Sequence, residues 1–315
     1  MIVVFLGNFR VPFTTENDLA WSYEKLGHKV IRMQEDYVTT QEVLAQASRA
    51  DLFHYVHTHG WETRGFMSMD EVLRKLKQRN IPTVSTHLDT WYGLRRASDV
   101  ANHPFWQTEY VFTADGGADE WIKSLGINHH YLKAGVVERD CFIGDYRESY
   151  AYDVIFVGSK QYHPEWPYRP QLINWLEKTY GSRFGHFGGD GRGVVRGKDL
   201  NDLYASAKVV VGDTLCLNFN RQEYWSDRIY ETTGRGGFII HPFIEGLQND
   251  FEIGKEIITY TYGDFDELKA KIDYYLQYDV EREKIQKAGH ERTKRDHTYT
   301  NRMEQVIKTV FGGRQ

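Results

Sequence analysis

The segment EYWSDRIYETTGRGGFIIHP, residues 223–242, holds two glutamates eight positions apart around an expected helix start. Ser226 is a good N-cap residue, which predicts that the helix opens with Asp227 and Arg228. Glu231 then lies on the second turn. A helix N-terminus offers unpaired N–H groups and about half a positive charge, so this segment can hold a phosphate or a diphosphate.

The two glutamates suit the two ends of a nucleotide-sugar. Glu231 can accept two hydrogen bonds from a ribose diol, as acidic residues do in nucleotide-binding folds. Glu223, in the loop before the helix, can contact sugar hydroxyls at the other end of the diphosphate. Alternatively, Glu231 is an ordinary surface residue of the helix and Glu223 an ordinary charge in a loop. The spacing of the two glutamates alone favours this second interpretation. The glycines of TGRGG favour the nucleotide-sugar interpretation, because they end the helix sharply and let it pack close to the strand GFIIHP.

Short runs rich in valine, isoleucine and aromatic residues alternate with helical patterns along the chain. The expected strands are residues 2–7, 29–34, 51–56, 82–88 and 110–115, and then, after a connector at about residues 135–153, residues 153–159, 183–188, 208–213, 237–242 and 256–262. The expected helices are residues 16–27, 41–48, 69–78, 169–181, 198–207 and 264–278, with further helix between residues 280 and 311. This alternation predicts an α/β protein with two doubly wound, Rossmann-like domains, residues 1–150 and 151–297. We expect them to face a central cleft at the carboxyl ends of their strands, where such sheets bind ligands.

Composition narrows the class of protein. A length of 315 residues suggests about two domains, and a hydrophobic content of 41% is enough for a core in each. The net charge of −5 argues against a general polyanion binder, and no apolar run has the length that spans a membrane. The first residues, MIVVFLGNF, are typical of a buried strand rather than a signal peptide. Cys141 and Cys216 lack metal-site spacing, which fits a reducing cytoplasm.

The order Glu, seven residues, Glu, glycine-rich turn and apolar strand resembles the C-terminal domain of GT-B-fold glycosyltransferases. It is most similar to the retaining family-4 enzymes and their spore-maturation-type relatives, the "glycosyl transferases group 1". The tail AGHERTKRDHTYTNRMEQVI is also similar, and GHKVIRMQ, ADLFHYVHTHGW, TVSTHL, LKAGV, VIFVGS and DLYASAKVVVGD follow in the family's order. The resemblance implies that residues 1–150 bind the acceptor and residues 151–297 the donor. It also implies that a helix at about residues 298–315 packs back on the first domain.

The resemblance assigns donor-binding roles to individual residues. Gly7 would let the backbone approach the donor phosphates, and Lys160 and Arg169 resemble the basic pair that neutralises the departing diphosphate. The sequence departs from the pattern after the glycine of VIFVGS, where serine replaces arginine and the insert KQYHPEWPY lengthens the gap. Arg228 would supply the missing charge. Ser226 stands where the family has a glycine.

The catalytic assignments also come from the resemblance. His87, in STHLD, corresponds to the histidine that faces the donor sugar, although a histidine at a strand end is by itself more often structural. Asp89 would orient an acceptor or act as a base. No residue is an obvious nucleophile, so His87 and Glu223 would assist through contacts to the sugar. The leaving phosphate or Asp89 would take the acceptor proton.

Acceptor contacts are expected in the loops of the first domain. His57 and His59, in VHTHGW, would line the cleft; a metal site there lacks a third ligand. Arg64, Arg95 and Arg96 either grip an anionic acceptor or are solvated surface charges. Because cationic side chains can handle the diphosphate, no metal or other cofactor is expected.

These observations and the resemblance predict a cytoplasmic, metal-independent glycosyltransferase with a UDP- or GDP-linked sugar donor, and the resemblance alone implies retention. A sugar, an aromatic aglycone, a phosphorylated lipid head and a modified DNA base, flipped out of its duplex, all remain open as acceptor. A sugar-nucleotide epimerase or phosphorylase-like enzyme on the same fold is an alternative. A non-catalytic nucleotide-sugar-binding protein is another, and the oligomeric state is open.

Overall fold

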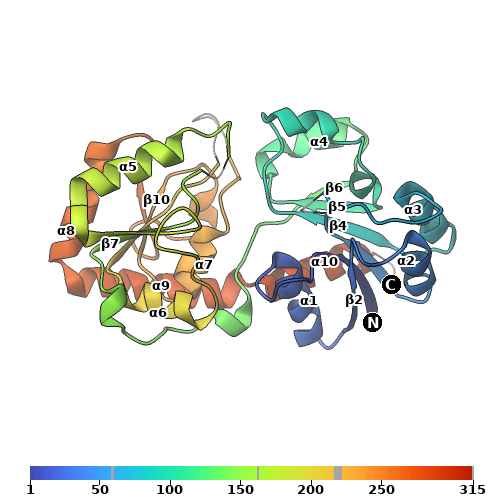
Figure 1. The fold of residues 1–315 in the computed structure, drawn as a ribbon, viewed down its shortest axis with the longest axis horizontal. Coiled ribbons are helices and arrows are strands. Elements are labelled where there is room, and N and C mark those ends of the chain that lie inside the picture. The colour runs from blue at the N-terminus through green and yellow to red at the C-terminus, as the bar shows by residue number, and fades with distance from the viewer. Residues whose placement is uncertain (58–59, 162, 216–221, 314–315) are drawn as a thin grey trace. The chain divides into compact units, whose positions relative to one another are not determined.

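The chain folds into two compact α/β units (Figure 1). The computed structural model describes residues 1–57, 60–161, 163–215 and 222–313. Unit 1 comprises Met1–Lys133 together with Tyr299–Gln315, and unit 2 comprises Ala134–Thr298. Each unit is built on one parallel sheet with helices on both faces, so the prediction of two doubly wound domains is confirmed.

Unit 1 contains a six-stranded sheet in the order β2-β1-β3-β4-β5-β6. Its strands are β1 (Ile2–Gly7), β2 (Lys29–Gln34), β3 (Leu52–Tyr55), β4 (Thr83–His87), β5 (Tyr110–Thr113) and β6 (His129–Tyr131). Its helices are α1 (Thr15–Lys25), α2 (Thr40–Ala47), α3 (Met69–Gln78), α4 (Asp119–Ser124) and α10 (Tyr299–Phe311). Local sequence explains these elements well: Thr14, Thr39 and Ser68 cap α1, α2 and α3 through their side-chain oxygens. Along α3, the apolar positions at helical spacing are the buried ones.

Unit 2 contains a five-stranded sheet in the order β11-β10-β9-β7-β8. Its strands are β7 (Val154–Val157), β8 (Phe184–Phe187), β9 (Val209–Val211), β10 (Ile239–Pro242) and β11 (Ile258–Tyr260). Its helices are α5 (Tyr168–Tyr180), α6 (Lys198–Ser206), α7 (Arg228–Gly234), α8 (Phe265–Gln277) and α9 (Asp279–Asp296). All four described pairings in this sheet are parallel, and the strand side chains are almost entirely buried. Burial on both faces is what parallel sheets of this class require.

The two sheets share one topological feature, a reversal of strand order beside the first strand. In unit 1 the strand β1 lies between β2 and β3, and in unit 2 the strand β7 lies between β8 and β9. The chain connections therefore run to opposite sides of β1 in unit 1, and to opposite sides of β7 in unit 2. In open parallel sheets, ligands bind outside the carboxyl ends of the strands at this switch point. The ends of β1 and β3, and those of β7 and β9, are accordingly where functional side chains are expected.

The boundary between the units differs from the expected one at residue 150. The units divide after Lys133, and residues 134–150 belong to unit 2. The side-chain amide of Asn201, on α6, donates to the carbonyls of Asp140 (2.8 Å) and Phe142 (2.6 Å), which ties the connector to the second core. In unit 1, α10 packs against α1 and completes the core from the far end of the chain (Figure 1). Within the described ranges, no helix has the length and apolarity needed to cross a membrane.

Candidate active site

Arg228 bridges the switch point of unit 2. Its Nε donates to the carbonyl of Val157 at the end of β7 (2.6 Å), and its Nη1 donates to the carbonyl of Asp213 just after β9 (3.1 Å). A Cβ built on Gly158 would approach Nη2 to 2.5 Å, so only glycine leaves room for the guanidinium there. Burial, reinforced by the neighbouring Arg169 cation, lowers the pKa of Arg228. An arginine nevertheless stays protonated in a protein, so a positive charge is held at the strand ends.

Arg169 lies beside Arg228 and shares its aromatic floor. The Arg169 side chain is only 3% exposed, and its Nε donates to Oδ2 of the fully buried Asp213 (2.9 Å). Both guanidinium carbons lie over the Phe156 ring, at 5.8 Å for Arg169 and 5.2 Å for Arg228. Trp166 donates its Nε1 to the same Asp213 oxygen (3.3 Å). The structure thus brings two of the expected donor-site cations together and adds Asp213, whose partnership with Arg169 over 44 positions had no local sequence signal.

The expected helix start was misplaced by one residue. The seven-residue helix α7 begins at Arg228, with Asp227 at the N-cap position and without a side-chain cap from it. Ser226 still contributes, because its hydroxyl accepts the N–H of Arg228 (3.3 Å) and donates to Asp227 Oδ1 (3.0 Å). Glu231 consequently lies in the first turn rather than the second. The short helix contributes less as a dipole than as the support that aims Arg228 at the strand ends.

Glu231 is held in place by an arginine that the sequence analysis did not single out. Arg235, one turn further along, donates its Nε to Glu231 Oε2 (2.7 Å) and its Nη2 to Asp140 Oδ2 (2.7 Å). Its Nη1 donates to Asn201 Oδ1 (2.5 Å). Burial raises the pKa of Glu231, and the Arg235 cation opposes this. The Glu231 carboxylate is therefore oriented before any ligand arrives, and the i,i+4 spacing of Glu231 and Arg235 was the signal that could have revealed the pair.

Glu223 lies in a strained part of the approach loop. Its φ of +51° places a non-glycine residue in the left-handed region, and its N–H donates to the carbonyl of Glu245 (2.8 Å). The following glycine of that neighbouring loop, Gly246, gives room for the Glu223 side chain, since a Cβ there would meet Glu223 Cγ at 2.9 Å. Strain of this kind costs about 1–3 kcal/mol and is concentrated at functional sites. The backbone of Glu223 is thus fixed by a loop that follows β10.

Lys160 and the loop after β7 are organised by an acidic residue from the next loop. Asp190 accepts the N–H groups of Lys160 and Gln161, both at 3.0 Å. The Lys160 ammonium lies 3.5 Å from Glu177 on α5. The role of Lys160 at a donor diphosphate stays a prediction. That role would require the Lys160 ammonium to leave Glu177.

An imidazole–carboxylate pair occupies the switch point of unit 1. His57 follows β3, and its Nδ1 lies 2.5 Å from Oε1 of Glu35, which follows β2. The side chains are 10% and 1% exposed, respectively. The His57 ring stacks on that of His103, with 4.3 Å between ring centroids. His59, the other histidine expected here, lies outside the described residues.

His87, at the end of β4, is enclosed by aromatic rings. It stacks on Trp106 (5.0 Å between centroids) and contacts Phe105 (3.8 Å) and Trp91 (5.6 Å). Burial, together with the nearby Arg96 cation, lowers its pKa well below the usual value, so the ring is neutral. Its Nε2 is buried and has no hydrogen-bond partner among the described residues. A neutral imidazole with an unsatisfied nitrogen is suited to a hydroxyl ligand.

The loop after β4 is fixed by Asp115, another residue missed by the sequence analysis. Its Oδ2 accepts the hydroxyl of Thr90 (2.8 Å) and the N–H groups of Trp91 (3.1 Å) and Tyr92 (3.2 Å). These contacts position Trp91 against His87. Asp89 precedes this turn and is half-buried, and its proposed role as a base remains a prediction.

The other residues that the sequence assigned to binding in unit 1 are either packed against neighbouring residues or exposed. Gly7 ends β1, where a Cβ would meet Glu16 Cγ at 2.9 Å, so packing against α1 explains the glycine without a ligand. The side chains of Arg64 and Arg95 are exposed. Arg96, in contrast, folds onto Trp91 (4.8 Å to the ring centroid) and donates its Nε to the Thr90 carbonyl (3.0 Å), which gives it a structural role.

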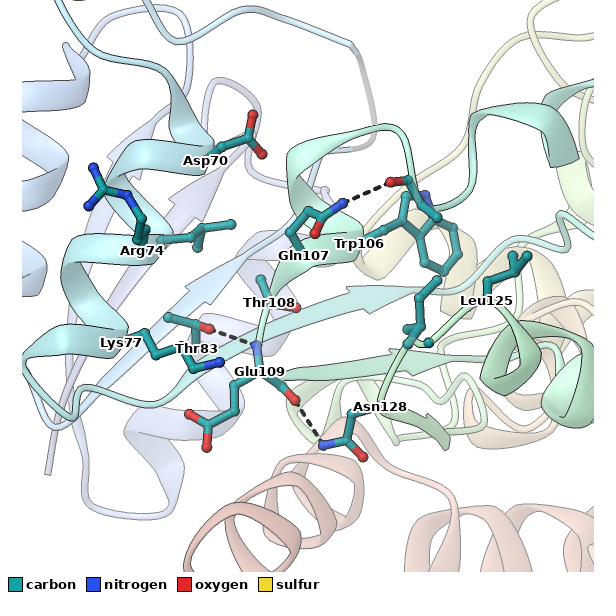
Figure 2. A pocket seen from close by; sticks show the side chains of 14 residues that line it. Asp70, Arg74, Lys77, Thr83, Trp106, Gln107, Thr108, Glu109, Leu125 and Asn128 are labelled. Carbon is teal, nitrogen blue, oxygen red and sulfur yellow. Dashed lines mark hydrogen bonds between the residues drawn. The ribbon is translucent and has the colours of Figure 1, made fainter.

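A cavity of about 430 Å³ lies at the opposite edge of the unit 1 sheet (Figure 2). Thr83 begins β4 there, Glu109 precedes β5 and Asn128 precedes β6, and these three are joined by hydrogen bonds of 2.8 Å. The cavity therefore opens at the amino ends of the strands. Ligands of parallel sheets bind at the other edge, so this cavity does not belong to the candidate active site.

Possible metal ligands include the described carboxylates and histidines. An Asp-x-Asp sequence, Asp264 to Asp266, follows β11. Asp264 caps α8 by accepting the N–H of Glu267 (2.9 Å), so its carboxylate is engaged with the helix. In the part of the chain that is described, no three metal-ligating side chains form a group. Metal independence remains an expectation about the reaction.

Two Rossmann-like units in tandem, each with candidate site residues at its switch point, are the architecture of GT-B glycosyltransferases. Residues 142–308, more than half of the chain, match the model of the glycosyl transferase-like family. The chain therefore belongs to this family and is a glycosyltransferase, as the sequence predicted. A comparison with curated protein sequences found no match.

Solved structures support the fold. HepE from Anabaena, solved in complex with UDP and glucose, is similar with a TM-score of 0.66 at 12% identity, over 99% of this chain and 100% of that chain. An alpha-glucosyltransferase in complex with UDP-glucose and DNA containing an abasic site has a TM-score of 0.70 at 9% identity, over 98% of each chain. Sucrose-phosphate synthase from Thermosynechococcus elongatus has a TM-score of 0.63 at 11% identity, over 99% of each chain. All three similarities are similarities of fold.

Proposed function

We propose that the protein transfers a sugar from a UDP-linked donor to a hydroxyl group of an acceptor, with unit 2 binding the donor and unit 1 the acceptor. One observation carries the proposal: the Arg228 guanidinium spans the ends of β7 and β9, at the point where this sheet topology binds ligands. The choice of uridine is supported by the solved structures of similar fold, HepE with UDP and alpha-glucosyltransferase with UDP-glucose.

The chemistry asked of unit 2 is stabilisation of a leaving group. As the bond from the anomeric carbon to the diphosphate breaks, negative charge develops on the departing UDP. Arg228 and Arg169 place two fixed cations beside each other to meet that charge. Asp213 keeps Arg169 oriented, so the cations need no rearrangement during the reaction. With these cations present, the reaction requires no metal in this proposal.

Other residues contact different parts of the donor. Glu231, oriented by Arg235, accepts hydrogen bonds from the ribose diol, and Glu223 contacts hydroxyls of the transferred sugar. His87 is neutral and offers its unsatisfied Nε2 to a sugar hydroxyl. Retention at the anomeric carbon, which the sequence resemblance favours, belongs to the proposal as well.

The acceptor is proposed as a hydroxyl-bearing small molecule. An acceptor in DNA is raised by the alpha-glucosyltransferase complex. Binding to duplex DNA depends mainly on cations that contact phosphates, and the net charge of −5 disfavours it. In the loop after β4, the half-buried Trp91 and the exposed Tyr92 suit the apolar face of a sugar or an aromatic ring better than a phosphate backbone.

Titration calorimetry with UDP and GDP tests the donor site. The wild-type chain should bind UDP more tightly than GDP, and Arg228→Met should weaken UDP binding about 10- to 100-fold, as expected for a lost charge-assisted hydrogen bond. Arg183 is the matched control: it precedes β8 at the opposite edge of the same sheet and pairs with Asp153 at 3.3 Å. Arg183→Met should bind UDP normally.

A product assay with radiolabelled UDP-glucose separates the activities. Release of UDP with transfer of label to an acceptor or to water supports a glycosyltransferase. An isomerised UDP-sugar would identify an epimerase, and tight binding without turnover would identify a nucleotide-sugar-binding protein. Equal UDP affinity of the wild-type and Arg228→Met chains would contradict the donor site.

A further inference from the structure

We propose that His57, oriented by the buried carboxylate of Glu35, is the base that takes the proton from the acceptor hydroxyl. The assignment rests on the proposed function, because it supplies the acceptor half of the same transfer. It goes beyond acceptor binding, since it gives His57 a catalytic role and gives Glu35 a positioning role.

The geometry of the pair sets the tautomer of His57. Glu35 follows β2, its N–H donates to the carbonyl of Gly7 (3.1 Å), and its side chain is almost completely buried beside β1. Its Oε1 lies 2.5 Å from His57 Nδ1, so the hydrogen on the ring belongs on Nδ1, where the carboxylate accepts it. Nε2 then carries the lone pair. A carboxylate that fixes an imidazole in this way also stabilises the imidazolium formed when Nε2 takes a proton.

Two of the histidines near His57 are themselves neutral. His103 stacks on the ring, and burial lowers its pKa to about 4, so it is neutral near pH 7. His87 is neutral for the same reason. Tyr55 lies 3.4 Å from His57 Nδ1 through its hydroxyl, and burial, followed by the Glu35 charge, raises the Tyr55 pKa. The Glu35 carboxylate is in direct contact with the imidazolium that forms when His57 takes a proton.

A second imidazole–carboxylate pair in the same sheet shows what a structural pair looks like. His129, at the start of β6, has its Nδ1 2.6 Å from Asp119 Oδ1, much like His57 and Glu35. Its Nε2, however, is bonded to the Thr113 hydroxyl at 2.7 Å, and its side chain is fully buried. For His57 Nε2, no hydrogen-bond partner exists in the described part of the chain. Of these two pairs, the one at the switch point is the one whose Nε2 is not already bonded within the described residues.

The proposed step moves one proton and exchanges one bond at the anomeric carbon. The acceptor hydroxyl gives its proton to His57 Nε2, and its oxygen forms the new bond to the anomeric carbon. The bond from that carbon to the diphosphate oxygen breaks, and UDP leaves with the electron pair. The His57 imidazolium then returns the proton to solvent. Either stereochemical course requires removal of this proton, so the step does not depend on retention.

The test compares two nucleophiles, water and azide, as acceptors for UDP-glucose. Water must lose a proton when it attacks, whereas azide carries none. His57→Asn keeps a donor toward Glu35 but lacks Nε2. It should slow attack by water about 10²- to 10⁴-fold, the usual contribution of a general base, and leave formation of glucosyl azide near the wild-type rate. Glu35→Gln should reduce attack by water by a smaller factor, again without loss of azide attack.

His129→Asn is the matched control, because it alters a similar pair that lies outside the switch point. It should lower the midpoint of urea unfolding while the ratio of water to azide attack stays at the wild-type value. Equal loss of both reactions in His57→Asn would overturn the assignment and leave His57 a positioning residue. A wild-type chain that binds UDP-glucose but reacts with neither nucleophile would overturn it too. Failure to bind UDP at all would instead contradict the proposed function.

Discussion

The switch points of the two sheets have the same topology and opposite chemistry. At the ends of β7 and β9 the protein places the guanidinium groups of Arg228 and Arg169. After the ends of β2 and β3, on either side of β1, it places the Glu35–His57 pair. In the proposed function, one topology therefore supplies two edges, one for an anionic diphosphate and the other for a neutral hydroxyl that must lose a proton.

Burial affects the two edges differently because arginine and histidine respond differently to it. Burial of a histidine lowers its pKa through the physiological range, as at His87 and His103, and the ring becomes neutral. Burial also lowers the pKa of Arg228, but its ordinary value is so high that the charge persists. In unit 2 the buried Arg169 cation is balanced by Asp213, whereas the neutral rings of His87 and His103 in unit 1 need no counter-charge.

The largest effect is expected when the cations lose their carboxylate. Asp213→Ala should lower the free energy of unfolding by about 3–5 kcal/mol, because it removes the carboxylate that pairs with the buried Arg169 guanidinium. Urea unfolding followed by fluorescence measures this. The double variant Asp213→Leu with Arg169→Met should recover much of the loss. A change below about 1 kcal/mol in Asp213→Ala would show that solvent or other contacts already compensate the guanidinium.

Acid should destabilise unit 1 through its buried histidines. Burial lowers the pKa of His54 from 6.5 to about 3, so its contribution is complete above pH 6.5 and is lost as the pH falls toward 3. At pH 5 the loss from His54 amounts to about 2 kcal/mol. In unit 2, burial lowers the pKa of His241 to about 4, which gives a comparable loss there, while His87 and His103 add to the loss in unit 1.

Urea unfolding at pH 7 and pH 5, combined with amide hydrogen exchange, checks this expectation. Amides of β3, which contains His54, should lose more protection on acidification than those of β7. His54→Asn should be less stable than the wild type at pH 7 but should lose about 2 kcal/mol less on acidification. Equal acid sensitivity of the wild type and the variant would mean that His54 does not titrate as its burial requires.

The smallest effect is expected at the ribose contact. Glu231→Ala should weaken UDP binding about fivefold, or about 1 kcal/mol, the usual net value of a hydrogen bond. The specific signature uses 2′-deoxy-UDP, which the wild type should bind less tightly than UDP. Glu231→Ala should bind the two ligands equally, as measured by calorimetry. If the variant still prefers UDP, Glu231 does not contact the 2′-hydroxyl.

Local features of the chain were predictable because their causes are local. The buried run IVVFLG forms β1, and the helix expected at residues 69–78 is α3, whose apolar positions face the core. The two α/β domains followed from the alternation of such segments, whereas the GT-B fold and the enzyme class came from the resemblance to a known family, which the family match bears out. The start of α7 was wrong by one residue, because a favourable cap sequence does not show where the backbone first becomes helical.

The partnerships at the candidate site were decided by the tertiary structure. Glu35 meets His57 because the strand order puts β1 between β2 and β3, so that residues 22 positions apart arrive at one edge. Arg169 meets Asp213 because α5 begins beside the end of β9. The sequence alone determined the periodicity of each element and the kinds of side chain at its ends. Which of these side chains touch depends on strand order and crossover direction, and these arise from packing whole helices against sheets rather than from any short stretch of residues.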